Sequence, residues 1–160
     1  MERKAAIRYS DAFNPVSLMS ISPFKFREIV FQLMYGADFG SADDAIVPLI
    51  MGQLAVTKRV VREAQELKGR IDAKCAEIDQ KIREESVAYD FERIPRVERN
   101  ILRLSVYELL FSEEVPPKVS IAEAIRLTRK FATPEAASFI NAILDSIYQK
   151  SVKHVCAAAD

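Results

Sequence analysis

The stretch Ile94–Phe111, which reads IPRVERNILRLSVYELLF, decides the fold. Its pattern predicts one helix, and apolar side chains cover most of the circumference of that helix. These side chains are Ile94, Val97, Ile101, Leu102, Leu104, Val106, Leu109 and Leu110. A helix that is apolar almost all round is stable when other helices cover it. We therefore expect this helix at the centre of the molecule.

Apolar residues at helical spacing predict further helices on both sides of this stretch. The first runs from Ser22 to about Asp38, and the pairs Ser22-Pro23 and Thr133-Pro134 each combine an N-cap residue with proline at the first helical position. A second helix begins between Asp44 and Pro48. The segment from Val61 to Ile82 forms one helix or two helices joined near Gly69. Two more helices run from Lys118 to Ala132 and from Thr133 to about Lys150.

Strands are not predicted, because the sequence has no Asn-Gly or Asp-Gly hairpin signal and no run of strict alternation between turns. We expect an all-α fold of about seven helices, in which two small helical bundles share the long apolar central helix. In this prediction residues 22–150 form a single helical domain. Residues 1–21 form an irregular N-terminal extension, and residues 151–160 form a C-terminal tail.

The charge balance limits how the protein recognises other molecules. The 160 residues include 23 Lys and Arg against 23 Asp and Glu, for a formal net charge of zero. No strong overall field attracts the protein to nucleic acid or to an anionic membrane, so binding has to come from a local patch. No stretch approaches the roughly 18 to 20 apolar residues that a membrane span needs. We expect a cytoplasmic protein that does not bind membranes.

Residues with catalytic or metal-binding chemistry are few. Cys75 and Cys156 lie far apart without a CxxC pattern, and the single histidine, His154, lies in the predicted tail. The sequence has no GxxxxGK[ST] phosphate loop, no GxGxxG after a strand and no HExxH. We therefore predict a protein that is not an enzyme and has no metal site and no cofactor.

The first predicted helix carries a combination typical of binding to single-stranded nucleic acid. Phe24, Phe31 and Tyr35 lie on a second face beside the core stripe, with Arg27 between the two faces and Lys25 exposed. Aromatic rings can stack on unpaired bases, and cations can neutralise phosphates. The alternative is that this face packs against the other bundle. Packing is favoured for Phe31, and both alternatives stay open for Arg27 and Tyr35.

The central helix has one polar strip, formed by Arg96, Arg99 and Arg103 at spacings of three and four residues. A polar strip on a largely covered helix faces either water or a partner, and a solvated strip with acidic neighbours is the usual outcome. Glu108 projects toward the predicted core. Because an unpaired buried carboxylate is costly, we expect Glu108 to act as a cap or to pair with a buried arginine.

The last predicted helix presents a second candidate surface near its N-terminus. Glu135 and Phe139 lie four residues apart along the flank of its core face. This spacing leaves a partly exposed aromatic ring beside a helix N-terminus. We interpret the pair as the edge of a binding site.

Four ordered blocks of the sequence resemble the NusB family of bacterial transcription antitermination factors. These blocks are FREIVFQLMY (26–35), IPRVERNILRLSVYELLF (94–111), VPPKVSIAEAI (115–125), and KFAT (130–133) followed by FINAILD (139–145). The resemblance covers about residues 22–148, with residues 41–90 matching by pattern alone. It implies an all-α fold of two helical bundles and a role without catalysis.

The resemblance also implies partners. Members of the family bind the boxA element of nascent RNA together with NusE, a protein of the small ribosomal subunit. The complex joins the elongating RNA polymerase with other Nus factors and suppresses termination, notably in ribosomal RNA operons. This chain is therefore expected to bind single-stranded boxA RNA, NusE and the RNA polymerase elongation complex.

Family positions carry over residue by residue. Lys25 and Arg27 match the end of an arginine-rich stretch that contacts RNA, and Ser22, Pro23 and Phe24 stand where further arginines are usual. Our hypothesis is that cations of the extension replace them. The RNA-binding residues implied are Lys25, Arg27, Tyr35, Arg99, Arg103, Glu135 and Phe139, with Arg3, Lys4 and Arg8 as the replacements. The NusE-binding residues implied are Glu98 and Arg103.

A second interpretation keeps the fold and changes the role. In it the chain is a helical protein-binding module, or a homodimer when free, with little intrinsic affinity for RNA. This interpretation is favoured because Ser22, Pro23 and Phe24 stand where members of the family usually have arginines. Binding to NusE without binding to RNA at moderate salt would distinguish it from the antitermination factor.

Overall fold

The computed structural model describes residues 21–40 and 43–157, and within these ranges the chain forms seven α-helices and one short 3₁₀ turn. This confirms the predicted all-α fold. The helices are α1 (Pro23–Ala37), α2 (Asp43–Leu54), α3 (Lys58–Ala73), α4 (Cys75–Glu85), α5 (Arg96–Phe111), α6 (Pro117–Phe131) and α7 (Pro134–Ala157), and the 3₁₀ turn η1 (Phe91–Arg93) precedes α5. None of the helices in these ranges has the length and apolar character that crossing a membrane requires.

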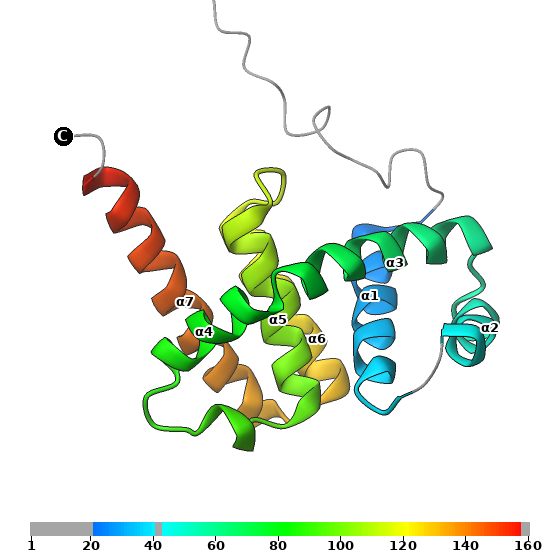
Figure 1. Cartoon of the computed structure of the whole chain (residues 1–160), viewed down its shortest axis with the longest axis horizontal. Coiled ribbons are helices and arrows are strands. Elements are labelled where there is room, and N and C mark those ends of the chain that lie inside the picture. The colour runs from blue at the N-terminus through cyan, green and yellow to red at the C-terminus, as the bar shows by residue number, and fades with distance from the viewer. Residues whose placement is uncertain (1–20, 41–42, 158–160) are drawn as a thin grey trace, which may run out of the picture.

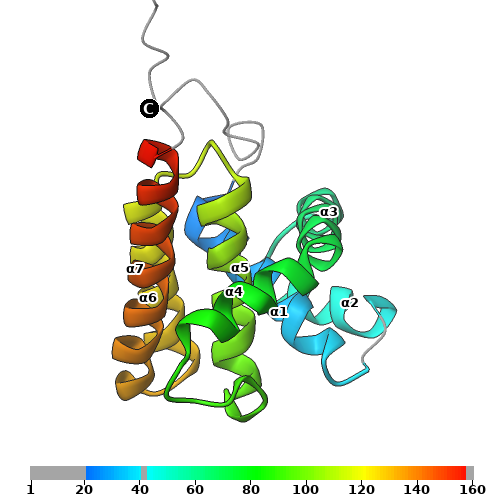
Figure 2. The ribbon, with the colours of Figure 1, turned by 60° about the vertical axis from the view of Figure 1, so that its left-hand side comes forward.

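The helices form two bundles, as predicted. Helices α1, α2 and α3 pack on one another at one side of the molecule, and α4, α5, α6 and α7 pack together at the other side (Figure 1). Helix α5 contacts both groups, because it lies against α4, α6 and α7 and also against α1 and α3. A second view shows α6 and α7 side by side and α2 and α3 on the opposite side (Figure 2). The apolar stretch that decides the fold is therefore the element that joins the bundles.

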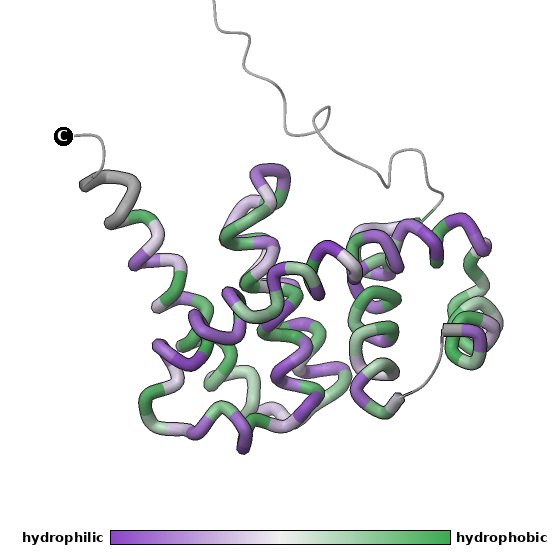
Figure 3. Tube along the Cα trace, in the orientation of Figure 1, coloured by the Kyte–Doolittle hydropathy of each residue, from purple (hydrophilic) through white to green (hydrophobic). Residues whose placement is uncertain are grey.

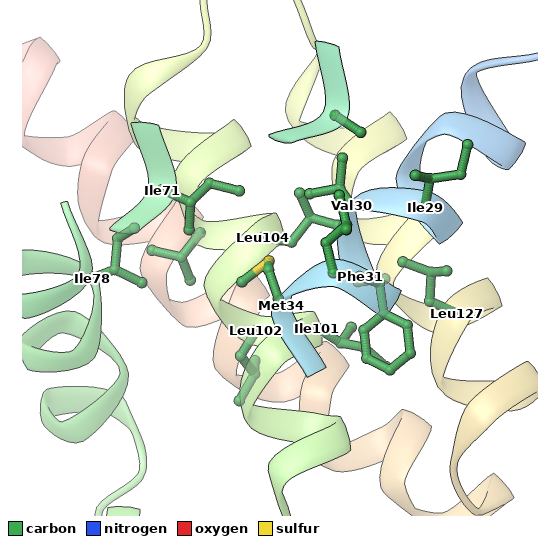
Figure 4. Close-up of a cluster of buried hydrophobic side chains, with 14 of the residues drawn as sticks. Ile29, Val30, Phe31, Met34, Ile71, Ile78, Ile101, Leu102, Leu104 and Leu127 are labelled. Atoms are coloured by element: carbon green, nitrogen blue, oxygen red, sulfur yellow. The ribbon is translucent and has the colours of Figure 1, made fainter. Parts of the chain in front are cut away.

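The hydrophobic core lies where α1 crosses α5. Buried side chains of five helices belong to this one cluster: Ile29, Val30, Phe31 and Met34 of α1, Ile101, Leu102 and Leu104 of α5, Ile71 of α3, Ile78 of α4 and Leu127 of α6 (Figure 4). The hydropathy pattern agrees, since apolar residues follow the inward sides of the helices (Figure 3). Each such side chain stabilises the fold by about 1.5–3 kcal/mol when it is fully buried.

Helix starts follow the predicted capping residues. The Ser22 side chain accepts a hydrogen bond from the Lys25 amide at 3.3 Å, and Pro23 occupies the first turn of α1. At the start of α7 the Thr133 hydroxyl accepts from the Ala136 amide at 3.3 Å. These caps satisfy amide groups that the first turn of a helix leaves without partners. The predicted pairs Ser22-Pro23 and Thr133-Pro134 are confirmed.

The segment predicted from Val61 to Ile82 forms two helices, but the break lies at Lys74 and not near Gly69. Lys74 has φ −104° and ψ 4°, between the last residue of α3 and the first residue of α4. Helix α3 packs on α1, while α4 packs on α5 and α7. One straight helix cannot follow both surfaces, so the change of direction falls where the chain passes from one bundle to the other.

The end of the last helix differs from the prediction. Helix α7 continues to Ala157, beyond the expected end near Lys150, so most of the segment predicted as a tail is helical. No glycine or proline follows Lys150 to stop the helix. The central helix begins at Arg96 and not at Ile94, because Pro95 takes the N-cap position with ψ 145°. Ile94 is nevertheless buried in the core.

Candidate nucleic-acid and partner interface

Arg27 lies inside the molecule. Helix α1 directs its side chain toward α5, where Nε donates a hydrogen bond to Glu108 Oε1 at 2.7 Å, and the Arg27 side chain is 9% exposed. Its Nη1 lies 4.0 Å from Glu123 Oε2 of α6. The expectation that Glu108 pairs with a buried arginine is confirmed. For Arg27 the geometry favours packing inside the molecule, and its expected contact with RNA stays a prediction.

Further ion pairs extend this contact into a network across α1, α5 and α6. Glu28 accepts hydrogen bonds from Arg126 at 2.6 Å and from Lys130 at 2.7 Å. The Arg126 Nε also donates to Glu123 at 3.1 Å. The network therefore contains three carboxylates, on Glu28, Glu108 and Glu123, and three cations, on Arg27, Arg126 and Lys130. The charges of these six residues balance and hold the three helices together.

Burial and ion pairing act in opposite directions on the carboxylates of this network. Burial raises the pKa of Glu108, and the neighbouring Arg27 only partly opposes the rise. Burial also acts to raise the pKa of Glu28, but the hydrogen bonds from Lys130 and Arg126 outweigh it and hold that pKa below 4.5. Glu28 therefore contributes to stability as an ionised group.

The start of α1 retains one predicted cation that is not used in the network. The Lys25 ammonium has no ion-pair partner within residues 21–40 and 43–157, and the side chain is half-buried. Beside it, Phe24 is 52% exposed and carries the Arg126 guanidinium 5.3 Å from its ring centroid. This end of α1 therefore presents an aromatic ring and an ammonium that has no ion pair among the described residues.

Two arginines of the polar strip of α5, Arg99 and Arg103, face other parts of the same chain, whereas Arg96 is exposed. Arg99 Nη2 donates to the carbonyl oxygens of Phe91, Glu92 and Ile94 at 3.2, 3.1 and 3.0 Å. Arg103 forms a two-pronged ion pair with Asp79 of α4, with both N···O distances at 2.8 Å. Both side chains are partly buried, and each has the acidic neighbour that the alternative expected, since Arg99 Nη1 also lies 3.9 Å from Glu92 Oε2. In this structure Arg99 and Arg103 hold η1 and α4 against α5, and their expected contacts with RNA or NusE stay predictions.

Glu98 differs from its neighbours on α5. Its carboxylate has no hydrogen bond or ion pair within the described part of the chain, although the side chain is half-buried. Burial raises the pKa of Glu98. A carboxylate in these surroundings gains a favourable interaction when an external cation approaches.

Two aromatic side chains predicted as binding residues lie partly exposed. The Tyr35 ring stacks on Phe31, with the ring centroids 5.9 Å apart. Phe139 meets the edge of Tyr89 at 5.2 Å, and Glu135 is exposed one turn before Phe139 on α7. Both rings are held by neighbouring rings and still keep some surface open to solvent.

Tyr89 is a candidate that the sequence did not indicate. It is 61% exposed in the connection between α4 and η1, beside a hollow of about 350 Å³. The hollow is lined by Arg83, Ser86, Val87, Ala88, Tyr89, Asp90 and Phe91. The available signal was an aromatic residue in a polar connection, but its contact with Phe139 comes from tertiary packing. Among the described residues, no group of three or more acidic, histidine or cysteine side chains is placed to hold a metal ion.

Comparison with known proteins identifies the family. The model of the NusB family matches residues 25–149, which is most of the chain. The chain belongs to the NusB family. A transcription antitermination protein NusB from Chlamydia pneumoniae is 39% identical over 140 residues, which cover 86% of this chain and 88% of that protein.

Solved structures of NusB proteins share the fold. NusB of T. maritima superposes with a TM-score of 0.68 at 29% identity, covering 80% of this chain and 92% of the other. A crystal structure of the antitermination factors NusB and NusE in complex with double-stranded RNA contains a chain that matches with a TM-score of 0.67 at 26% identity. That match covers 79% of this chain and 96% of the other.

The NusB family match includes all the predicted site residues that the structure describes, from Lys25 on α1 to Phe139 on α7. The predicted replacements Arg3, Lys4 and Arg8 lie outside the described residues. Within the match the structure divides the predicted residues into two groups. Arg27, Arg99 and Arg103 bond within the chain, and Lys25, Tyr35, Glu98, Glu135 and Phe139 keep surface or bonding capacity for partners.

Replacing Arg27 should destabilise the protein strongly. In Arg27→Met, the Glu108 carboxylate stays buried without its partner, so we expect the free energy of unfolding to fall by about 3–5 kcal/mol in urea denaturation. The double variant Arg27→Met/Glu108→Leu removes both charges and should recover most of that loss. A single variant as stable as the wild type would contradict a structural role for this pair.

The pH dependence of stability should include a contribution from Glu28. Its pKa is lowered in the folded state, so its stabilising effect is complete above 4.5 and is lost as the pH falls through the folded pKa. Glu28→Gln should therefore be less stable than the wild type at neutral pH, and the difference should shrink on acidification. Urea denaturation from pH 7 to pH 3 measures it. A difference that does not change with pH would contradict the lowered pKa.

Proposed function

We propose that this protein is a transcription antitermination factor that acts by binding RNA and has no catalytic activity. In this proposal it binds the boxA element of nascent transcripts together with NusE, notably transcripts of ribosomal RNA operons. The complex then joins the RNA polymerase elongation complex with other Nus factors in the cytoplasm. The observation that carries the proposal is the NusB family match over residues 25–149, supported by the solved relative that holds NusE and RNA.

The proposed RNA surface depends on stacking more than on charge. Tyr35 and Phe139 offer partly exposed rings for unpaired bases, and Lys25 offers an ammonium for a phosphate. Glu135 is exposed beside Phe139, and its carboxylate can accept hydrogen bonds from the exocyclic amino groups of bases. With a formal net charge of zero, such local contacts have to provide the affinity.

The proposed NusE surface includes Glu98 on α5. Its half-buried carboxylate lacks a partner within the described residues and would pair with a cation of NusE. Arg103, which the family resemblance places at the same surface, would act through Asp79, because this ion pair holds α4 against α5. We assign Arg103 a positioning role in this proposal.

The burial of Arg27 favours a second candidate function. Without that guanidinium, α1 loses one of the two cations that the family resemblance assigned to RNA. The protein would then be a helical protein-binding module or a homodimer with little RNA affinity of its own. The two candidates differ in whether the chain selects boxA RNA.

A titration of fluorescent single-stranded boxA RNA separates the candidates. The antitermination factor should bind this RNA more tightly than a scrambled sequence, and NusE should tighten the binding. Phe139→Ala should weaken binding about 5-fold to 150-fold, because one base–aromatic stack contributes about 1–3 kcal/mol. Leu49→Ala is the control, since Leu49 is 62% exposed on α2 and has no assigned role.

The salt dependence of RNA binding and a separate measurement of NusE binding distinguish the two candidate functions. Measuring at two salt concentrations shows whether phosphate contacts contribute, because each contact on a single strand adds about 0.7 to the slope of log affinity against log salt. Binding of NusE with no selective RNA binding, even at the lower salt, would favour the protein-binding module. Equal affinities for Phe139→Ala and wild type would remove Phe139 from the site.

A substitution at Glu98 tests the NusE surface. Glu98→Gln keeps the size of the side chain and removes its charge, so we expect NusE binding to weaken about 10-fold or more by calorimetry. RNA binding without NusE should stay unchanged. Glu66→Gln on the exposed side of α3 is the matched control. Wild-type affinity of Glu98→Gln for NusE would exclude Glu98 from the interface.

A further inference from the structure

Phe39 is an exposed aromatic residue at the end of α1 that the proposed function does not yet use. It follows the helix in a tight turn, and 58% of it is exposed. Its ring meets the edge of the Tyr35 ring, with centroids 4.9 Å apart. The Arg96 guanidinium lies 4.8 Å from the centroid of the Phe39 ring. Phe39 is thus bracketed by Tyr35 and Arg96.

The turn that carries Phe39 is fixed to the first turns of α5. Asp38 Oδ2 accepts a hydrogen bond from Asn100 Nδ2 at 2.6 Å, and the Asp38 carbonyl accepts from Arg96 Nη1 at 3.0 Å. The Phe39 amide donates to the Gly36 carbonyl at 3.1 Å, and Gly40 closes the turn with φ +69°. The last turn of α1 and the start of α5 lie at the same end of the molecule (Figure 1). These contacts hold Phe39 in place at the surface.

Arg96 keeps bonding capacity for a ligand. The side chain is exposed, and its one hydrogen bond within the described ranges is the bond from Nη1 to Asp38. A guanidinium has five N–H donors, so four of them make no hydrogen bond among the described residues. Planar guanidinium groups and aromatic rings are the groups on which unpaired bases stack, and free guanidinium N–H groups bind phosphate.

We propose that Phe39 and Arg96 together bind one unpaired nucleotide of the RNA. The base stacks on the open side of the Phe39 ring, and Arg96 contacts a phosphate next to that base. The site continues the RNA surface from Tyr35 and rests on the proposed function. A nucleotide fits better than a protein side chain, because the neighbouring exposed residues Ala37 and Gly40 offer little apolar surface for a protein hot spot.

Three variants at Phe39 test the stacking contact. In titrations of the full-length chain with boxA RNA and NusE, Phe39→Ala and Phe39→Leu should bind about 5-fold to 150-fold more weakly than wild type. Phe39→Tyr keeps a ring and should bind like wild type. Leu49→Ala, which removes another exposed apolar side chain on α2, should have no effect. Equal thermal unfolding of all variants shows that the loss comes from binding.

Arg96 is tested by the salt slope. Arg96→Gln should lower the slope of log affinity against log salt by about 0.7, the value for one phosphate contact on a single strand. RNA carrying 4-thiouridine at single positions should cross-link to Phe39 from one position on irradiation, as located by mass spectrometry. Phe39→Ala should lose that cross-link.

The outcomes separate this site from the proposed function. If wild type selects boxA RNA and Phe39→Ala binds it equally well, the nucleotide site is wrong and the proposed function stands. If wild type does not select the RNA even with NusE, the proposed function fails and this site fails with it. If Phe39→Ala loses affinity for NusE alone and keeps its RNA affinity, the ring contacts a protein and the nucleotide site is overturned.

Discussion

The buried ion pair between Arg27 and Glu108 is the contact on which the rest of the structure depends. It joins α1 to α5 at 2.7 Å in the region where the two bundles meet. Two charges in a buried place are tolerated when each satisfies the other, and neither can be removed alone without a large loss of stability. Glu28 and Glu123 extend the pairing to α6 through Arg126 and Lys130. The orientation of α1 is therefore set by charge pairing as well as by apolar packing.

This internal pairing determines what the surface can offer to a partner. A cation that pairs with a buried carboxylate attracts phosphates only weakly, because the carboxylate neutralises its field. The chain as a whole also has no formal net charge. In the proposed function, recognition of RNA then depends on cations without an ion pair among the described residues, such as Lys25, and on rings with open surface, such as Phe139 and Phe39. Stacking acts at short range and depends less on salt than phosphate neutralisation does. We therefore expect the selectivity of this chain for RNA to come from short-range contacts, and long-range electrostatic attraction to add little to the association rate.

The sequence predicted the elements better than the contacts between them. Helical spacing and N-cap residues located the helices, and the cost of an unpaired carboxylate predicted the partner type of Glu108. The break at Lys74 was not predictable, because it depends on which surfaces α3 and α4 cover. The partner of Arg103 and the position of Tyr89 also depend on packing between segments that are distant in the sequence, so the sequence did not predict them. Spacing shows which side of a helix is polar, but the segment that meets that side comes from elsewhere in the chain.

The polar strip of α5 acts on the candidate surface through the connection before it. Arg99 binds three carbonyl groups around η1, and its guanidinium lies 4.8 Å from the centroid of the Phe91 ring. Arg83 of α4 lies 4.2 Å from the same centroid. These contacts fix the connection that carries Tyr89, and Tyr89 in turn supports Phe139 on α7. Arginines that make no contact with a ligand can therefore determine whether an aromatic ring is held ready for one, because a fixed ring loses less conformational entropy on binding.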